Sequence, residues 1–237
     1  MLGQIEKFNA QIFSKARSIC VPGSGLAVKP GFEEYYSATY QLWYQSISEG
    51  LTSEGLTEQA QALLSDDFLR QNEIHCLFNE ALAIGLFAFS WMNLQFVATR
   101  KQQYFIKNYP PYLLDQICEQ GHHVIMTMGH LSVHPDWRKS KIGFGVVDIL
   151  MGFAVKRFLE SPATLLLTFT RNNRKTHELC YRFGGKPLLK DQVSHTIASD
   201  IIAFHKDDVV PSPIEGIHEA VEKLWLKKTN ISVIPLF

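Results

Sequence analysis

Alternation of apolar and polar positions is clearest in the middle of the chain. Phe87, Phe89 and Trp91 fall on every second position, which is the period of a β-strand. The apolar run 81–98 approaches the length of a membrane-spanning helix, but the alternation and the polar residues inside it favour a strand. A short turn at 79–80 separates this run from another apolar run, so the pattern predicts a β-hairpin.

Helical spacings dominate before and after the hairpin. Aromatic residues recur at helical spacing between 32 and 50, which predicts a helix with one aromatic face. Thr57 is a candidate N-cap for a second helix over 57–70, and two prolines suit the start of a helix over 110–121. A further helix is expected before the segment 22–31, which is rich in glycine and proline.

Strands and helices alternate in the second half of the chain. The predicted order is a strand over 122–133, a helix over 145–159, a strand over 163–170, a helix over 173–183, a strand near 196–205, a helix near 213–228 and a strand over 231–237. This order predicts a mixed α/β or α+β fold. We expect one domain over 1–237, with an extension over 1–31, helices over 32–72, a core over 73–205 and a C-terminal helix and strand over 206–237.

Charge and cysteine usage narrow the class of protein. Lysine plus arginine and aspartate plus glutamate each number 23, so the net charge is zero. Nucleic acid and an anionic membrane are therefore not expected partners, and any anion site must be local. Cys20, Cys76, Cys118 and Cys180 lack ligand spacing, which favours free thiols over disulfides or zinc. The first residues lack the basic-then-apolar order of a signal peptide, so we expect a cytoplasmic protein. Because metal-ligand spacing is absent, we expect no bound metal.

The segment 130–145 runs from a predicted strand through a cluster of cations towards a predicted helix. Main-chain N–H groups at the start of a helix bind phosphate, glycines leave room for an anion to approach, and cations add attraction. The candidate residues are Arg138, Lys139, Lys141, Gly143 and Gly145. This chemistry predicts a diphosphate site, and the alternative is a solvated basic loop.

The spacing in this segment fits neither the Walker A loop nor the dinucleotide-binding glycine motif. It resembles the acyl-CoA loop of the GCN5-related N-acetyltransferases (GNAT superfamily). The residues that carry the resemblance are Val133, Pro135, Trp137, Arg138, Ile142 and Gly143. Lys141 departs from the family pattern, which usually has glycine there, and its ammonium would add charge in place of a close-approaching amide.

A second match follows one predicted strand and one predicted helix later. Asn173, Leu179 and Gly184 take the places of family residues. In that register Cys180 stands where the family's tyrosine protonates the departing CoA thiolate. A shift by one residue places Tyr181 there and loses the asparagine, and both alternatives remain open.

The resemblance covers about 74–205 and implies a GNAT-like twisted mixed β-sheet, splayed at the cofactor strands and flanked by helices. It implies acetyl-CoA, or another acyl-CoA, as cosubstrate, and a small-molecule or peptide amine as acceptor. Backbone groups of Leu131 and Val133 would bind pantetheine. The implied cofactor-binding residues are Leu131, Val133, Arg138, Lys139, Lys141, Ile142, Gly143, Gly145 and Asn173.

Transfer to an amine needs a base, because only the deprotonated amine attacks a thioester. His130 and His134 lie on the predicted cofactor strand, and an ordinary imidazole titrates near ~6.5. Strict alternation places both on the face opposite Leu131 and Val133, although either could be a surface or packed histidine. These two histidines and Tyr181 are the candidate catalytic residues.

The acceptor is expected to contact the helices over 32–70 and the segment 92–120. Aromatic rather than acidic residues dominate there, which favours an apolar or aromatic amine, although an aromatic stripe is also typical of a core. The stripe consists of Tyr35, Tyr36, Tyr40, Trp43 and Tyr44. The leading hypothesis is N-acetyl transfer. The alternatives are long-chain N-acyl transfer from acyl-CoA or acyl carrier protein and a non-catalytic acyl-CoA-binding or regulatory module. A homodimer is left open.

Overall fold

The computed structural model describes residues 15–63, 65–138, 145–194, 197–211, 213–214 and 216–234. The chain divides into two compact units. Unit 1 consists of Met1–Phe89, His130–Phe153 and Ile214–Phe237, and unit 2 consists of Ser90–Gly129 and Ala154–Pro213. The boundary falls inside the strands β3 (Leu82–Asn93) and β4 (Val124–Val133) and inside the helix α8 (Val146–Glu160). These three elements therefore contribute to both units.

Unit 1 contains an antiparallel hairpin with a further strand on its outer side. β2 (Glu73–Asn79) pairs with β3 and with β1 (Ala16–Val21), and β8 (Thr229–Asn230) pairs in parallel with β1. The end of β4 lies beside β3 in this unit, and the His134 amide after it donates to the Ile84 carbonyl at 3.0 Å. The hairpin that the alternation predicts is confirmed, with a turn in which Glu80 has a φ of 57°.

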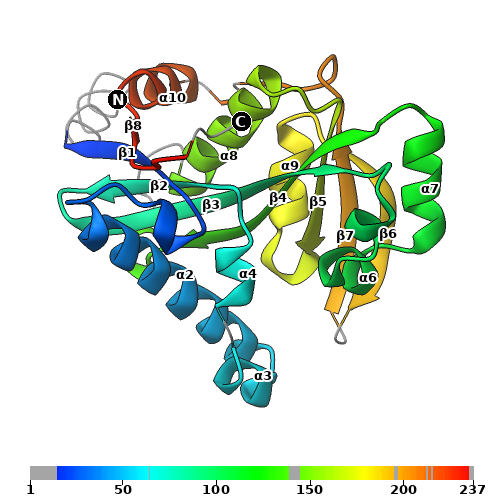
Figure 1. Ribbon diagram of the computed structural model, residues 1–237, viewed down its shortest axis with the longest axis horizontal. Helices are drawn as coiled ribbons and strands as arrows, with labels where there is room; N and C mark the ends of the chain where they lie inside the picture. Colours follow the sequence, from blue (N-terminus) through cyan, green and yellow to red (C-terminus); the bar gives the residue numbers. More distant parts are fainter. Residues whose placement is uncertain are drawn as a thin grey trace. The chain divides into compact units, whose positions relative to one another are not determined.

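β2 is covered by helices on both faces. Cys76 and Phe78 belong to the core cluster that includes residues of α2 (Glu33–Ser53). His75, on the other face because strand side chains alternate, packs against Phe153 of α8 and stacks on Trp225 of α10 (Ile217–Leu226). Figure 1 shows α2 on one side of these strands and α10 on the other. Two short helices, α3 (Thr57–Gln61) and α4 (Asp66–Leu69), follow α2.

The aromatic face of α2 is mainly core. Trp43 is buried, and Tyr40 packs edge-on against Phe68 at 5.2 Å between ring centroids. Tyr35 and Tyr36 make similar edge contacts with buried phenylalanines, and only Tyr44 of the stripe is exposed. The stripe is therefore partly core, and its contact with an acceptor stays a prediction.

Unit 2 is a mixed sheet with its own core. β4 pairs in parallel with β5 (Leu165–Arg171) over three residue pairs, from Ile125–Leu165 to Thr127–Leu167. β7 (Ile197–Phe204) runs antiparallel to β5 and to β6 (Lys186–Ser194). The helices are α5 (Val97–Arg100), α6 (Gln103–Asn108), α7 (Pro111–Glu119) and α9 (Thr176–Arg182). The mixed sheet with flanking helices confirms the predicted fold class.

Three predicted elements need correction, and one strand was not predicted. Ala16–Val21 is a strand, not the end of a helix, and β6 was not predicted at all. The expected helix over 57–70 is broken into α3 and α4, with Leu56 rather than Thr57 at the N-cap. The closing strand is Thr229–Asn230; the described part of the predicted strand, 231–234, is not a regular strand, and 235–237 lie outside the described residues. Among the described residues no helix is both long and apolar enough to cross a membrane.

Candidate functional site

The segment after β4 folds into a tight turn. Pro135–Trp137 forms a single turn of 3₁₀-helix, η2. The Trp137 amide donates to the His134 carbonyl at 2.9 Å, and the Arg138 amide donates to the Pro135 carbonyl at 3.2 Å. Both amides are thus satisfied within the turn and are not available to an anion.

One main-chain amide at the start of the helix that follows already has a partner. The Gly145 amide, expected to bind diphosphate, donates to the Asp148 carboxylate Oδ2 at 2.7 Å. Asp148 is buried, and an acidic side chain that returns to the first amides of its own helix caps them. In this structure Gly145 therefore has no free amide for an anion. The other expected residues of the loop, Lys139, Lys141, Ile142 and Gly143, lie outside the described residues.

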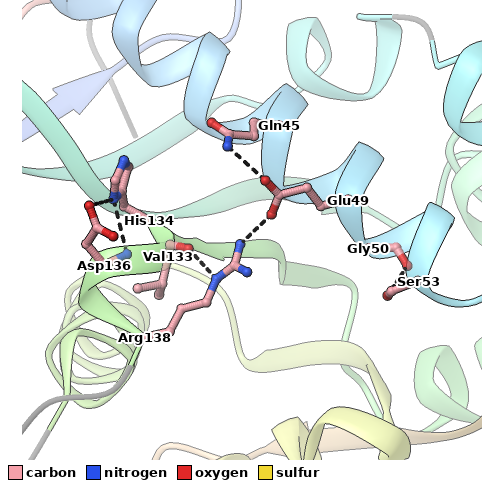
Figure 2. A network of polar contacts seen from close by, with 8 residues as sticks. All are labelled: Gln45, Glu49, Gly50, Ser53, Val133, His134, Asp136 and Arg138. Carbon is pink, nitrogen blue, oxygen red and sulfur yellow. Dashed lines mark hydrogen bonds and ion pairs between the residues drawn. The ribbon is translucent and has the colours of Figure 1, made fainter.

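Arg138 is held at two points on its guanidinium (Figure 2). Its Nε donates to the Val133 carbonyl at 2.9 Å, and its Nη2 donates to Glu49 Oε2 at 3.0 Å. The Val133 carbonyl, expected to contact pantetheine, is therefore engaged by Arg138. Leu131, the other expected backbone contact, is half-buried on β4.

Glu49 connects this turn to helix α2. Gln45, one helical turn earlier, donates to Glu49 Oε1 at 2.8 Å, so the two carboxylate oxygens have different partners. The hydrogen bonds from Gln45 and from Arg138 hold the pKa of Glu49 below its ordinary value. The charge of His134 acts in the same direction. The carboxylate is therefore ionised at neutral pH.

His130 interrupts the regular alternation of β4. Its φ of 60° is left-handed, which is uncommon for a residue other than glycine and typical of a local irregularity in a strand. Its ring packs edge-on against Trp43 at 5.9 Å between centroids. Burial, together with the charge of Arg70, lowers the pKa of His130 to about 4. The imidazole is therefore neutral at pH 7 and a weak base.

His134 caps the η2 turn. Its Nδ1 accepts a hydrogen bond from the Asp136 amide at 3.4 Å and lies 3.8 Å from a carboxylate oxygen of Asp136. The side chain is 24% exposed, so solvent can reach it. Because the alternation is interrupted at His130, the expectation that both histidines lie on one face does not follow from the strand's geometry.

A polar cluster surrounds Tyr181 in unit 2. The Tyr181 hydroxyl donates to Asp200 Oδ2, while Asp200 Oδ1 accepts from Asn172 Nδ2 and from the Asp191 amide, both at 2.9 Å. Burial, and then the hydrogen bond to Asp200, raise the pKa of Tyr181. Burial opposes ionisation of Asp200, but the hydrogen bonds from Tyr181 and Asn172 prevail and lower its pKa. The phenol stays protonated beside an ionised carboxylate.

The neighbours of Tyr181 differ from the family pattern. Cys180 is buried, and burial raises the pKa of its thiol to about 12. Asn173, expected in the cofactor site, is exposed in the turn that precedes α9, while the adjacent Asn172 makes the contacts with Asp191 and Asp200. Of the two alternatives, Tyr181 is the residue with a partly exposed polar group.

Three buried residues that no sequence motif connects lie close together. The potential ligand atoms of Cys20, Glu73 and His75 lie within 4.8 Å of one another. His75 Nε2 is hydrogen-bonded to Glu73 and lies 3.7 Å from Cys20 Sγ. A metal would need the lone pair of that same nitrogen, so the geometry is that of a hydrogen-bonded core histidine. Cys20 and His75 are 55 positions apart, too far for ligand spacing to reveal.

No family model and no curated protein matches the sequence. Solved structures do match in fold. FeeM, an N-acyl amino acid synthase from uncultured soil microbes, is 10% identical with a TM-score of 0.51, over 89% of this chain and 98% of that one. BjaI, a CoA-dependent acyl-homoserine lactone synthase solved with SAM and isopentyl-CoA, is 8% identical with a TM-score of 0.56, over 93% and 95%.

A second structure of BjaI, with MTA, gives a TM-score of 0.54 over the same shares of the two chains. Identities this low establish the fold alone. The GNAT-like fold that the two sequence motifs imply is therefore confirmed, while the roles of individual residues rest on the geometry described above.

Proposed function

We propose that this protein is an N-acyltransferase that moves an acyl group, in the first instance acetyl, from acyl-CoA to an amine. The observation that carries the proposal is the likeness over nearly the whole chain to a CoA-dependent synthase, with a TM-score of 0.56. The sequence motif that ends at Gly143 adds independent support, because it resembles an acyl-CoA loop.

The cofactor's anionic part would be bound mainly by side chains and by the loop over 139–144. The side chain of Arg138 is 45% exposed, and a guanidinium can bind two phosphate oxygens at once. Lys139 and Lys141 would add charge. Gly145 is excluded from the proposal, because its amide is bonded to Asp148.

In the proposed reaction the amine nitrogen attacks the thioester carbonyl, the C–S bond breaks, and the CoA thiolate leaves. His134 would accept the proton of the amine at Nδ1, where the new N–H replaces the long hydrogen bond from the Asp136 amide and faces the Asp136 carboxylate, whereas the pKa of about 4 makes His130 a poor base. Tyr181 stays the candidate proton donor that the family resemblance implies; its raised pKa keeps the phenol protonated but makes it a weak acid towards a thiolate.

Thermal unfolding with and without acetyl-CoA tests the binding step. A ligand at ~100 times its Kd stabilises the folded protein by about 2.7 kcal/mol, so the unfolding temperature should rise. Arg138→Gln should bind CoA about tenfold more weakly, since it removes a charge-assisted hydrogen bond. Lys107→Gln, which removes an exposed cation of α6, should behave like the wild type. Absence of any shift with acyl-CoA would reject the proposal.

Steady-state kinetics test the chemical step. Tyr181→Phe should lower kcat about 100-fold, the middle of the usual range for a lost proton donor, with CoA affinity unchanged. An unchanged kcat would remove Tyr181 from the reaction.

A larger acyl group is the second candidate. Its support is that the two neighbours named above are an N-acyl amino acid synthase and a synthase crystallised with isopentyl-CoA. Measuring kcat/KM with acetyl-, isopentyl- and long-chain acyl-CoA decides between the candidates. A maximum at acetyl-CoA would leave the first candidate, and a maximum at a longer chain would replace it.

A further inference from the structure

We propose that Glu49 binds the ammonium group of the acceptor, and that it becomes available only when the diphosphate of acyl-CoA takes Arg138 from it. This inference rests on the proposed function and names a residue that selects the second substrate. It would make acyl-CoA the first ligand to bind and the amine the second.

Two nitrogens of the Arg138 guanidinium already have hydrogen-bond partners. Val133 occupies its Nε and Glu49 occupies its Nη2, at 2.9 and 3.0 Å (Figure 2). A phosphate that engages a guanidinium through two parallel hydrogen bonds needs two neighbouring N–H groups. With Nε fixed on the backbone, the pair of terminal nitrogens is the remaining edge, and a phosphate bound there would share Nη2 with Glu49, so the two anions would repel each other across the same nitrogen.

The ion pair between Arg138 and Glu49 is weak. Arg138 and Glu49 are 45% and 41% exposed, and solvent-exposed ion pairs contribute little to stability. A diphosphate brings more negative charge than one carboxylate, so the exchange favours the cofactor. Glu49 therefore competes only weakly with the diphosphate for Arg138.

After the exchange, Glu49 keeps one of its two hydrogen-bond partners. Gln45 still donates to Glu49 Oε1 at 2.8 Å, which keeps the carboxylate in place on α2, while Oε2 loses its partner. The pKa of Glu49 is below its ordinary value, with the Gln45 hydrogen bond as the largest cause. An oriented, ionised and newly unpaired carboxylate is a suitable partner for an ammonium group.

The competition is tested by calorimetric binding of CoA to Glu49→Gln. This change removes the competing charge, so CoA should bind about two- to fivefold more tightly, the range that corresponds to an exposed ion pair. Pantetheine, which lacks the diphosphate, should bind both proteins equally. Glu34→Gln removes an exposed charge from the same helix and should leave both affinities unchanged. Weaker or unchanged CoA binding in Glu49→Gln would overturn the competition.

The acceptor role is tested with the primary amine that gives the fastest CoA release in a panel that includes tyramine and phenethylamine. Glu49→Gln should raise KM for that amine at least tenfold, because a charge-assisted hydrogen bond is lost, while kcat changes by less than threefold. An unchanged KM would overturn the ammonium-binding role even though acyl transfer stands. If CoA binds but no amine of the panel is acylated, the proposed acyl transfer to such amines is wrong, and this inference falls with it.

Discussion

His130 is a single residue whose titration should be visible in the stability of the protein. Its pKa of about 4 in the folded state lies below the ordinary value near ~6.5. Between these values the unfolded chain binds a proton that the folded chain does not, so acidification destabilises the fold. From pH 7 to pH 5 this residue should contribute a loss of about 1–2 kcal/mol.

His130→Asn is the matched variant, because asparagine tolerates a left-handed φ and does not titrate. Urea unfolding at pH 7 and pH 5 should show a smaller loss of stability for the variant than for the wild type. Equal losses would mean that His130 does not titrate as described.

The sequence motifs indicated two residues that lie in polar networks, but they did not reveal the residues that these two contact. The two motifs indicate Arg138 and Tyr181 as candidate site residues, and both lie in polar networks. Glu49 is 89 positions from Arg138, and Asp200 is 19 positions from Tyr181, so no local spacing reveals either pair. The hydrogen bond from the Gly145 amide to Asp148 was predictable from the sequence, because an acidic residue in the first turn of a helix is a capping signal.

The packing of α8 on β3 gives a prediction at the level of elements. A Cβ atom on Gly85 would lie 2.5 Å from Val146 Cγ1 and 3.0 Å from Leu150 Cδ1. Gly85→Ala should therefore destabilise the protein by about 1–3 kcal/mol through overpacking. Gly129→Ala, on β4, has no atom within 4 Å of the added carbon and serves as control in thermal unfolding. Equal unfolding temperatures for both variants would contradict the close approach of α8 to β3.

Elements with strong periodicity were predictable, and those without it were not. α2 follows from its aromatic spacing, and the β2–β3 hairpin follows from alternation. β6 has two irregularities in its register with β7 and contains Pro187, so its side chains show no clear period. β1 is a short strand whose last four residues are all buried, and a short apolar run does not distinguish strand from helix.

For the whole molecule, the interleaving of the two units predicts cooperative unfolding. β3, β4 and α8 each pass from one unit to the other, so neither unit can lose its strands without breaking an element of its neighbour. Scanning calorimetry should show one transition with a calorimetric enthalpy equal to the van't Hoff enthalpy. Two separated transitions would show that the units unfold independently.

Composition carried less information at this scale than the two motifs did. A net charge of zero argued only against general attraction to polyanions, whereas the residues from Val133 to Gly143 led to the fold that the structural neighbours confirm. The division into two units was not foreseen, because neither unit is a continuous stretch of sequence and no linker marks the boundary.

This interleaving also bears on how the protein is made. Ile231 and Trp225 are buried in unit 1 together with residues from the first ninety positions. On the ribosome, β1, β2 and β3 emerge long before these partners, and the face of β2 that packs on α8 and α10 stays uncovered until α10 leaves the exit tunnel. Newly made chains should therefore depend on chaperones until α10 has been made, and a stop before 214 should yield an aggregating product rather than a smaller folded one.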